Sequence, residues 1–182
     1  MRYLFIIIIN IVYLNGCTNY ASKSENVLII DKINIHETYK IDSLNNFVNG
    51  IVMFEETGRP DLEASNVVIG AHSGYGSNAY FNEIYSLEKD DLIELIYNST
   101  KYIYSVEKVD IVDKKDTYIL NDTKESILTL ITCKISDKDK RIVVISELIN
   151  KIDIWHNVRY NVFEELRRVL YGKTNFSKFT GW

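Results

Sequence analysis

The sequence predicts a mostly β fold, a mostly antiparallel barrel or sandwich built from seven or eight short strands. Short apolar runs that alternate with polar residues recur along the chain, and this pattern is typical of strands. Only short helical segments separate the runs, so the strand–helix–strand rhythm of a parallel α/β sheet does not develop. From Asn150 the apolar spacing changes to three or four residues, which predicts a C-terminal amphipathic helix.

Turn-forming residues separate the predicted strands in order along the chain. Gly58 and Pro60 mark one loop, and Asn98 with Ser99 indicates a hairpin between two adjacent strands. A polar loop with a small apolar centre is expected over 113–126. The predicted strands are 26–41 (one or two strands), 50–54, 66–72, 90–97, 101–112, 127–134 and 141–148.

Two short helical segments are expected between the strands. The first is a helical turn over 42–48, which an Asp or Ser side chain can cap. The second covers 79–87 and is expected to place Phe81, Ile84 and Tyr85 on one face.

The N-terminus contains an apolar run over 3–14 that is broken only by Asn10. As a helix it would be roughly 18 Å long, short of the ~30 Å hydrocarbon core of a bilayer, so it fits the apolar part of a secretory signal. Residues 14–17, Leu-Asn-Gly-Cys, are similar to a bacterial lipobox. Either a lipid-modified Cys17 or a short uncleaved anchor would tether the chain to the membrane and place residues 25 onward on its extracellular face.

The sequence therefore divides into an N-terminal signal or anchor segment (1–24), a barrel domain (25–149) and a C-terminal helical extension (150–182). The net charge of −4 gives no electrostatic support for nucleic-acid binding. From Lys151 onward six Lys or Arg residues face three Asp or Glu residues, a local charge of +3 that leaves about −7 on the rest of the chain. This basic end could lie near an anionic membrane surface, or it could simply form a solvated helix face.

Three side chains at predicted strand ends could form a reactive site. Cys133 ends an apolar strand, His72 ends another, and Arg141 begins the last one. A disulfide with Cys17 is improbable, since Cys17 directly follows the apolar N-terminal run. At one rim of a barrel, thiolate, imidazole and guanidinium would suit acyl transfer. Taken singly, each has a plainer explanation: a small core cysteine, a satisfied rim histidine and a solvated arginine.

The chain resembles the sortases, cysteine transpeptidases of Gram-positive bacteria. The resemblance covers roughly residues 27–148 and rests on Asn-Val-Val-Ile-Gly-Ala-His over 66–72, on Thr-Leu-Ile-Thr-Cys over 129–133 and on Arg-Ile-Val-Val over 141–144. Phe81 and Leu87, which follow the histidine strand, also match.

The resemblance implies an eight-stranded sortase β-barrel and assigns three catalytic roles. Cys133 would be the nucleophile, His72 the general acid and base, and Arg141 the group that holds the substrate backbone and stabilises the oxyanion. The family cleaves LPxTG-type sorting signals of surface proteins between Thr and Gly. It holds the acyl group as a thioester and passes it to an amine on a cell-wall precursor or a pilin lysine.

The resemblance also implies which residues contact the substrate. Thr132 would line the groove, and Tyr118, Ile119 and Leu120 would contact the Leu-Pro part of the signal. No cofactor is expected.

The chain departs from the family pattern at several points. Ala71 stands where the family usually has glycine before the histidine, and the loop over 134–140 is short. A pilin-type lid is not expected before the barrel. Some members of the family bind calcium through carboxylates near the loop before the histidine strand. The spacing of the carboxylates in that part of this chain does not match, and no metal is expected. The available carboxylates are Glu55, Glu56, Asp61 and Glu63.

Two alternatives remain open beside a transpeptidase. The barrel could bind sorting signals or wall peptides without turning them over, or it could belong to a surface lipoprotein that serves only as an interaction module. The presence of Cys133, His72 and Arg141 together favours the enzyme.

Overall fold

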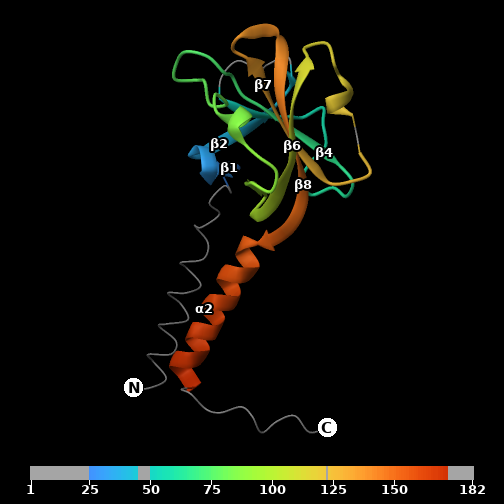
Figure 1. The fold of residues 1–182 in the computed structure, drawn as a ribbon. Helices are drawn as coiled ribbons and strands as arrows, with labels where there is room; N and C mark the ends of the chain where they lie inside the picture. Colours follow the sequence, from blue (N-terminus) through green and yellow to red (C-terminus); the bar gives the residue numbers. More distant parts are fainter. Residues whose placement is uncertain (1–24, 45–49, 122, 172–182) are drawn as a thin grey trace.

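The computed structural model describes residues 25–44, 50–121 and 123–171, and these form a closed eight-stranded barrel followed by a helix (Figure 1). The strand order around the barrel is β1-β2-β3-β4-β7-β8-β6-β5. Two neighbouring pairs, β2 with β3 and β4 with β7, are parallel, and the other pairs are antiparallel. The strands are β1 (Val27–Ile30), β2 (Ile35–Asp42), β3 (Ile51–Phe54), β4 (Asn66–Gly70), β5 (Leu92–Tyr97), β6 (Thr100–Asp113), β7 (Ile127–Lys134) and β8 (Asp137–Asp153). The predicted eight-stranded β-barrel is confirmed.

Alternation of side chains along the strands fills the barrel interior. In β5, Ile93 and Leu95 are fully buried while the residues between them are partly exposed. Successive side chains of a strand point to opposite faces, so one face of each strand supplies the core. β3 and β4 are buried along their whole length, and their outward side chains form a second apolar cluster with Leu120 and Ile131. This second cluster lies outside the barrel and becomes part of the site described below.

The β5–β6 hairpin forms at the predicted position. Asn98 and Ser99 both have positive φ angles, 48° and 64°, as a two-residue type I′ turn requires. Asparagine tolerates this conformation better than most residues, which explains why the dipeptide is a useful turn signal.

The predicted helix over 79–87 is wrong. The segment forms turns that end in a short 3-10 helix, η3 (Ile84–Ser86). Phe81 and Ile84 are fully buried, but Tyr85 is 59% exposed. A spacing of three residues places Phe81 and Ile84 on one side of such turns, and Tyr85 falls off that side.

β8 is much longer than the predicted strand over 141–148. It begins at Asp137, directly after a tight turn at Ile135 and Ser136, and it continues to Asp153 because β6 pairs with it along almost the whole length. The helix α2 (Ile154–Tyr171) therefore begins four residues later than the change of apolar period indicates. Figure 1 shows that α2 runs away from the barrel and does not pack along it.

Several predictions concern residues outside the described ranges. They are the N-terminal anchor over 1–24 with Cys17, most of the helical turn over 42–48, and the last part of the C-terminal extension. In the part of the chain that the structure describes, no helix combines the length and the apolar character needed to cross a membrane.

Candidate active site

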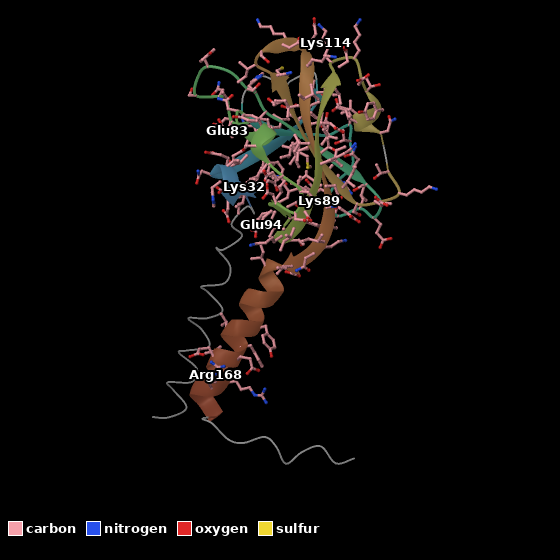
Figure 2. The ribbon with its side chains drawn as sticks, viewed as in Figure 1. Lys32, Glu83, Lys89, Glu94, Lys114 and Arg168 are labelled. Atoms are coloured by element: carbon pink, nitrogen blue, oxygen red, sulfur yellow. The ribbon has the colours of Figure 1, made fainter. Side chains whose placement is uncertain are left out.

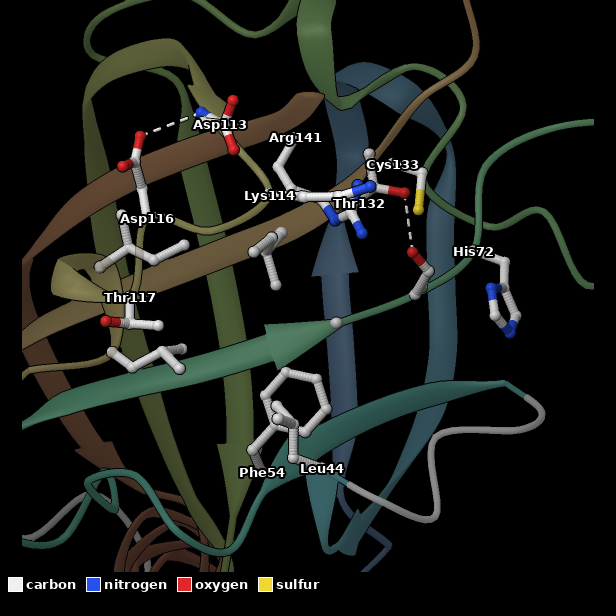
Figure 3. A pocket seen from close by; sticks show the side chains of 15 residues that line it. Leu44, Phe54, His72, Asp113, Lys114, Asp116, Thr117, Thr132, Cys133 and Arg141 are labelled. Atoms are coloured by element: carbon white, nitrogen blue, oxygen red, sulfur yellow. Dashed lines mark hydrogen bonds between the residues drawn. The ribbon is translucent and has the colours of Figure 1, made fainter. Parts of the chain in front are cut away.

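The parallel pairing of β4 and β7 brings two predicted site residues to the same end of the barrel. Gly70 is paired with Ile131, so His72 and Cys133 both follow the last paired positions of their strands. The buried hydroxyl of Thr132 donates a hydrogen bond to the carbonyl of Ala71 at 2.7 Å, which ties the two strand ends together. Figure 3 shows Thr132 and Cys133 next to each other, with His72 on the neighbouring chain segment.

Antiparallel pairing of β7 and β8 places Arg141 directly opposite Cys133. The guanidinium Nη1 atom of Arg141 donates to the carbonyls of Lys138 and Lys140, both at 3.1 Å. These bonds fix the guanidinium beside the β7–β8 turn. They use one of its three nitrogen atoms, which leaves Nε and Nη2 as further donors toward the cavity.

His72, Cys133 and Arg141 line one cavity of about 360 Å³ at the barrel rim (Figure 3). All three side chains are partly exposed, so a peptide could reach the sulfur. The structure thus brings together the three side chains that the sequence pattern singled out. The remaining lining residues are Leu44, Phe54, Gly70, Ala71, Asp113, Lys114, Asp116, Thr117, Ile119, Leu120, Ile131 and Thr132.

The substituted position before the histidine accommodates its methyl group. Ala71 is 1% exposed and belongs to the barrel core. It is not among the described residues with positive φ, so an alanine side chain causes no backbone strain there.

The predicted substrate loop contributes two of its three apolar residues to the cavity. Tyr118, Ile119 and Leu120 form a short 3-10 helix, η4. Ile119 is buried and, like Leu120, lines the cavity, whereas Tyr118 is not a lining residue and is 56% exposed. Thr132 also lines the cavity, although its hydroxyl is directed to the backbone.

A buried asparagine holds this loop in place. Asn66 Nδ2 donates to the carbonyl of Ile119 at 2.7 Å and to that of Asn121 at 3.1 Å. Its Oδ1 accepts a hydrogen bond from the hydroxyl of Thr129 at 2.8 Å. This role is not predictable from the sequence pattern, because a polar residue at the start of a strand is ordinarily solvated.

The opposite wall of the cavity was also missed by sequence reasoning. Phe54 ends β3, and Leu44 follows β2, so the two come from segments that the sequence pattern does not link to the site. The carboxylate of Glu56 accepts hydrogen bonds from the Ser43 hydroxyl at 2.5 Å and from the Leu44 amide at 3.1 Å, which fixes Leu44. The Ser43 hydroxyl, followed by backbone amides, lowers the pKa of Glu56.

A second cavity, of about 570 Å³, meets the first at Cys133. Its walls are largely apolar and include Tyr85, Ile111 and Ile135, each more than half exposed. Ser73 lines the end near the sulfur, where its hydroxyl donates to the carbonyl of Cys133. Cys133 is therefore reachable from two sides.

Two of the four carboxylates considered for calcium have other partners. Glu56 binds Ser43 and Leu44 as described, and Asp61 pairs with Arg59 at 3.2 Å. Among the described residues no group of three or more His, Cys, Asp or Glu side chains is placed to hold a metal ion.

Comparison with known proteins gives a consistent picture. Residues 24–149 match the family model described as "Sortase domain". Sortase A of Bacillus anthracis is 33% identical over 85 residues, which are 46% of this chain and 40% of that protein. The chain thus aligns with well under half the length of this curated relative.

Solved structures extend the similarity to the fold. A Clostridium perfringens sortase D5 transpeptidase superposes with a TM-score of 0.61 at 27% identity, over 70% of this chain and 79% of that one. A lid mutant of sortase A from Corynebacterium diphtheriae superposes with a TM-score of 0.63 at 20% identity, over 70% of each chain.

Proposed function

Because this chain belongs to the sortase family, we propose that it is a cysteine transpeptidase that cleaves a C-terminal sorting signal of the LPxTG type and transfers the acyl group to an amine. The observation that carries the proposal is the convergence of Cys133, His72 and Arg141 on one open cavity. Cys133 and Arg141 are opposite each other in the β7–β8 hairpin, and His72 follows β4, which is distant in sequence and pairs with β7 in the barrel. Sortases act at the cell surface, and we place this chain on the extracellular face of the membrane.

The first half of the reaction forms a thioester. The Cys133 thiolate attacks the carbonyl carbon of the signal's threonine, a C–S bond forms, and the carbonyl electron pair moves to oxygen. Arg141 stabilises the resulting oxyanion. The intermediate then collapses, the C–N bond breaks, and the imidazolium of His72 gives its proton to the departing amine.

The second half reverses these roles. The acceptor amine attacks the thioester carbon and passes a proton to the imidazole of His72, and the C–S bond breaks to release the thiolate. The net result exchanges one peptide bond for another, so no oxidant, reductant or cofactor is consumed.

The first cavity suits the apolar part of the signal. Its apolar walls include Leu44, Phe54, Ile119, Leu120 and Ile131. Burying one leucine side chain between such walls contributes about 1.5–3 kcal/mol. This supports assigning the Leu-Pro part of the signal to the first cavity.

The second cavity suits the arriving amine. It shares Cys133 with the first cavity and otherwise has different lining residues, so an acceptor placed there could reach the thioester while the acyl chain stays bound. A pilin lysine or a cell-wall precursor would supply this amine.

The test is to incubate the protein with LPxTG-type peptides and detect the thioester by mass spectrometry. We expect an adduct whose mass is that of the protein plus the peptide up to threonine. Cys133→Ala should abolish the adduct, and His72→Ala should slow its formation strongly. If peptides bind but no adduct forms while Cys133 still reacts with an alkylating agent, the barrel is a binding module and the proposal is wrong.

A further inference from the structure

The helix α2 exposes apolar side chains along one side. Val162 is 53% exposed, Phe163 68% and Leu166 38%. At about 100° per residue these three lie on one side of the helix. The ion pairs Glu164–Arg167 (3.2 Å) and Glu165–Arg168 (3.4 Å) lie on the other sides. For this apolar side, defined as Val162, Phe163 and Leu166, the barrel provides no cover, because α2 runs away from it (Figure 1).

α2 leaves the barrel at the end from which the chain enters β1. The amide of Ile154 donates to the carbonyl of Ser99 at 3.0 Å, in the β5–β6 turn. β5 also pairs with the first residue of β1, since Val27 is opposite Ile96. The start of α2 and the segment preceding β1 are therefore three strand spacings apart, or roughly 15 Å.

The candidate active site lies at the other end of the barrel. Arg141 and Asp153 are 12 positions apart on the continuous strand β8, which corresponds to roughly 40 Å. In Figure 2, Lys114, which lines the first cavity, lies at the far end of the barrel from α2, which carries Arg168.

Charge distinguishes between the possible partners of α2. From Lys151 onward the chain carries +3, whereas the rest carries about −7. α2 itself contains three Arg and two Glu residues, a net charge of +1, and the residues that flank it add +2. An amphipathic helix that carries a net positive charge, with aromatic and aliphatic residues on one side, is suited to the interface of an anionic bilayer. The charged residues on α2, which include the pairs Glu164–Arg167 and Glu165–Arg168, suit an interfacial position better than a spanning one.

We propose that α2 docks on an anionic lipid surface through its apolar side and so holds the barrel with its catalytic cavity directed away from the membrane. This goes beyond the acyl-transfer function and does not depend on it. The docked helix would add a second attachment beside the N-terminal segment, so the barrel could not rotate freely about a single tether.

The experiment uses the full chain in vesicles, with single cysteines on α2 that carry an environment-sensitive fluorophore. Cys17→Ser and Cys133→Ala remove the native thiols. Phe163→Cys and Leu166→Cys report the apolar side, and Glu164→Cys and Arg168→Cys are matched controls on the charged sides. The N-terminal segment is otherwise constant, so differences between labels report α2 alone.

In phosphatidylglycerol-containing vesicles we expect the labels at 163 and 166 to shift to the blue. An aqueous quencher should reach them severalfold less than the labels at 164 and 168. In phosphatidylcholine vesicles, or at high salt, the difference should shrink severalfold. Reversing charge with Arg167→Glu and Arg168→Glu should have the same effect as neutral lipid.

Three outcomes overturn the proposal. Equal quenching of all four labels means that α2 does not dock. Protection that grows with the protein-to-lipid ratio means that a second copy covers the apolar side. Protection that is unchanged in phosphatidylcholine vesicles and at high salt means that an anionic surface is not what covers the apolar side, and the chain's own N-terminal run is then the occupant.

The acyl-transfer function is tested separately in the same vesicles. A Phe163→Glu and Leu166→Glu variant that keeps Cys133 should still form the thioester with a soluble peptide, even when α2 no longer docks.

Discussion

Asn66 is predicted to control substrate affinity without taking part in the reaction. Its side chain makes three buried or partly buried hydrogen bonds, two to the loop carbonyls of Ile119 and Asn121 and one from Thr129. In Asn66→Leu the shape is nearly kept, but both carbonyls and the hydroxyl lose their partner. An unsatisfied buried group costs about 1–3 kcal/mol, and part of this cost is recovered by water at the more exposed Asn121. We therefore expect a loss of about 2–4 kcal/mol in the free energy of unfolding.

Two measurements separate the role of Asn66 in the loop from its role in general stability. Urea unfolding gives the loss of stability, and thioester formation against peptide concentration gives KM and kcat. Because the loop carries Ile119 and Leu120 into the cavity, we expect KM to rise about tenfold for each 1.4 kcal/mol of lost binding, while kcat changes little.

Thr129→Val is the matched control for this prediction. It removes the third hydrogen bond but leaves both bonds from Asn66 to the loop. It should cost about 1–2 kcal/mol of stability and leave KM unchanged. If Asn66→Leu leaves KM unchanged as well, or if kcat falls instead, the loop is not held by Asn66 in the way described here.

Three further substitutions test other parts of the structure. Thr132→Val should lower the free energy of unfolding in urea by about 1–3 kcal/mol and slow adduct formation, because the Ala71 carbonyl loses its donor. Thr132→Ser keeps a hydroxyl and should behave like the wild type. Equal stability of the wild type and both variants would contradict this. Gly58→Ala should lower the midpoint of thermal unfolding and reduce the free energy of unfolding by about 1–3 kcal/mol, since the added Cβ would lie 2.7 Å from the Cβ of Ser65. An unchanged midpoint would mean that the loop moves to accommodate the methyl group. Glu56 has a pKa below its ordinary value of 4.5, so its contribution to stability is complete above pH 4.5 and is lost as the pH falls through the lowered pKa. Glu56→Gln should therefore make the free energy of unfolding depend less on pH in that acidic window. If the variant and the wild type have identical stability profiles, the bond to Leu44 is not a source of acid sensitivity.

Local patterns in the sequence predict most of the strands. The alternation in β5 and the Asn98-Ser99 turn are readable because each depends only on neighbouring residues. The full length of β8 was not predictable, since Asn150, Lys151 and Asp153 near its end are polar and are held in a strand by pairing with β6. The segment over 79–87 was misread because three apolar residues fit both an α-helix and a series of tighter turns.

The candidate site was predictable where residues lie next to the reacting sulfur. Cys133, His72 and Arg141 follow from strand ends and from family resemblance, and the structure places them around one cavity. The supporting residues were not predictable, because their roles depend on distant pairings. Asn66 contacts a loop more than fifty residues away, and Leu44 reaches the cavity only because the barrel closes.

The continuous strand β8 has a mechanical consequence. It carries Arg141 near its beginning and joins α2 at its end, and it is hydrogen-bonded to β7 on one side and to β6 on the other. These bonds are perpendicular to the strand, so a pulling force applied between α2 and Cys133 would load them in shear. Many bonds then share the force at once and do not open one after another like a zipper. A pulling force directed along β8 is therefore resisted by the whole length of its pairing with β6 and β7.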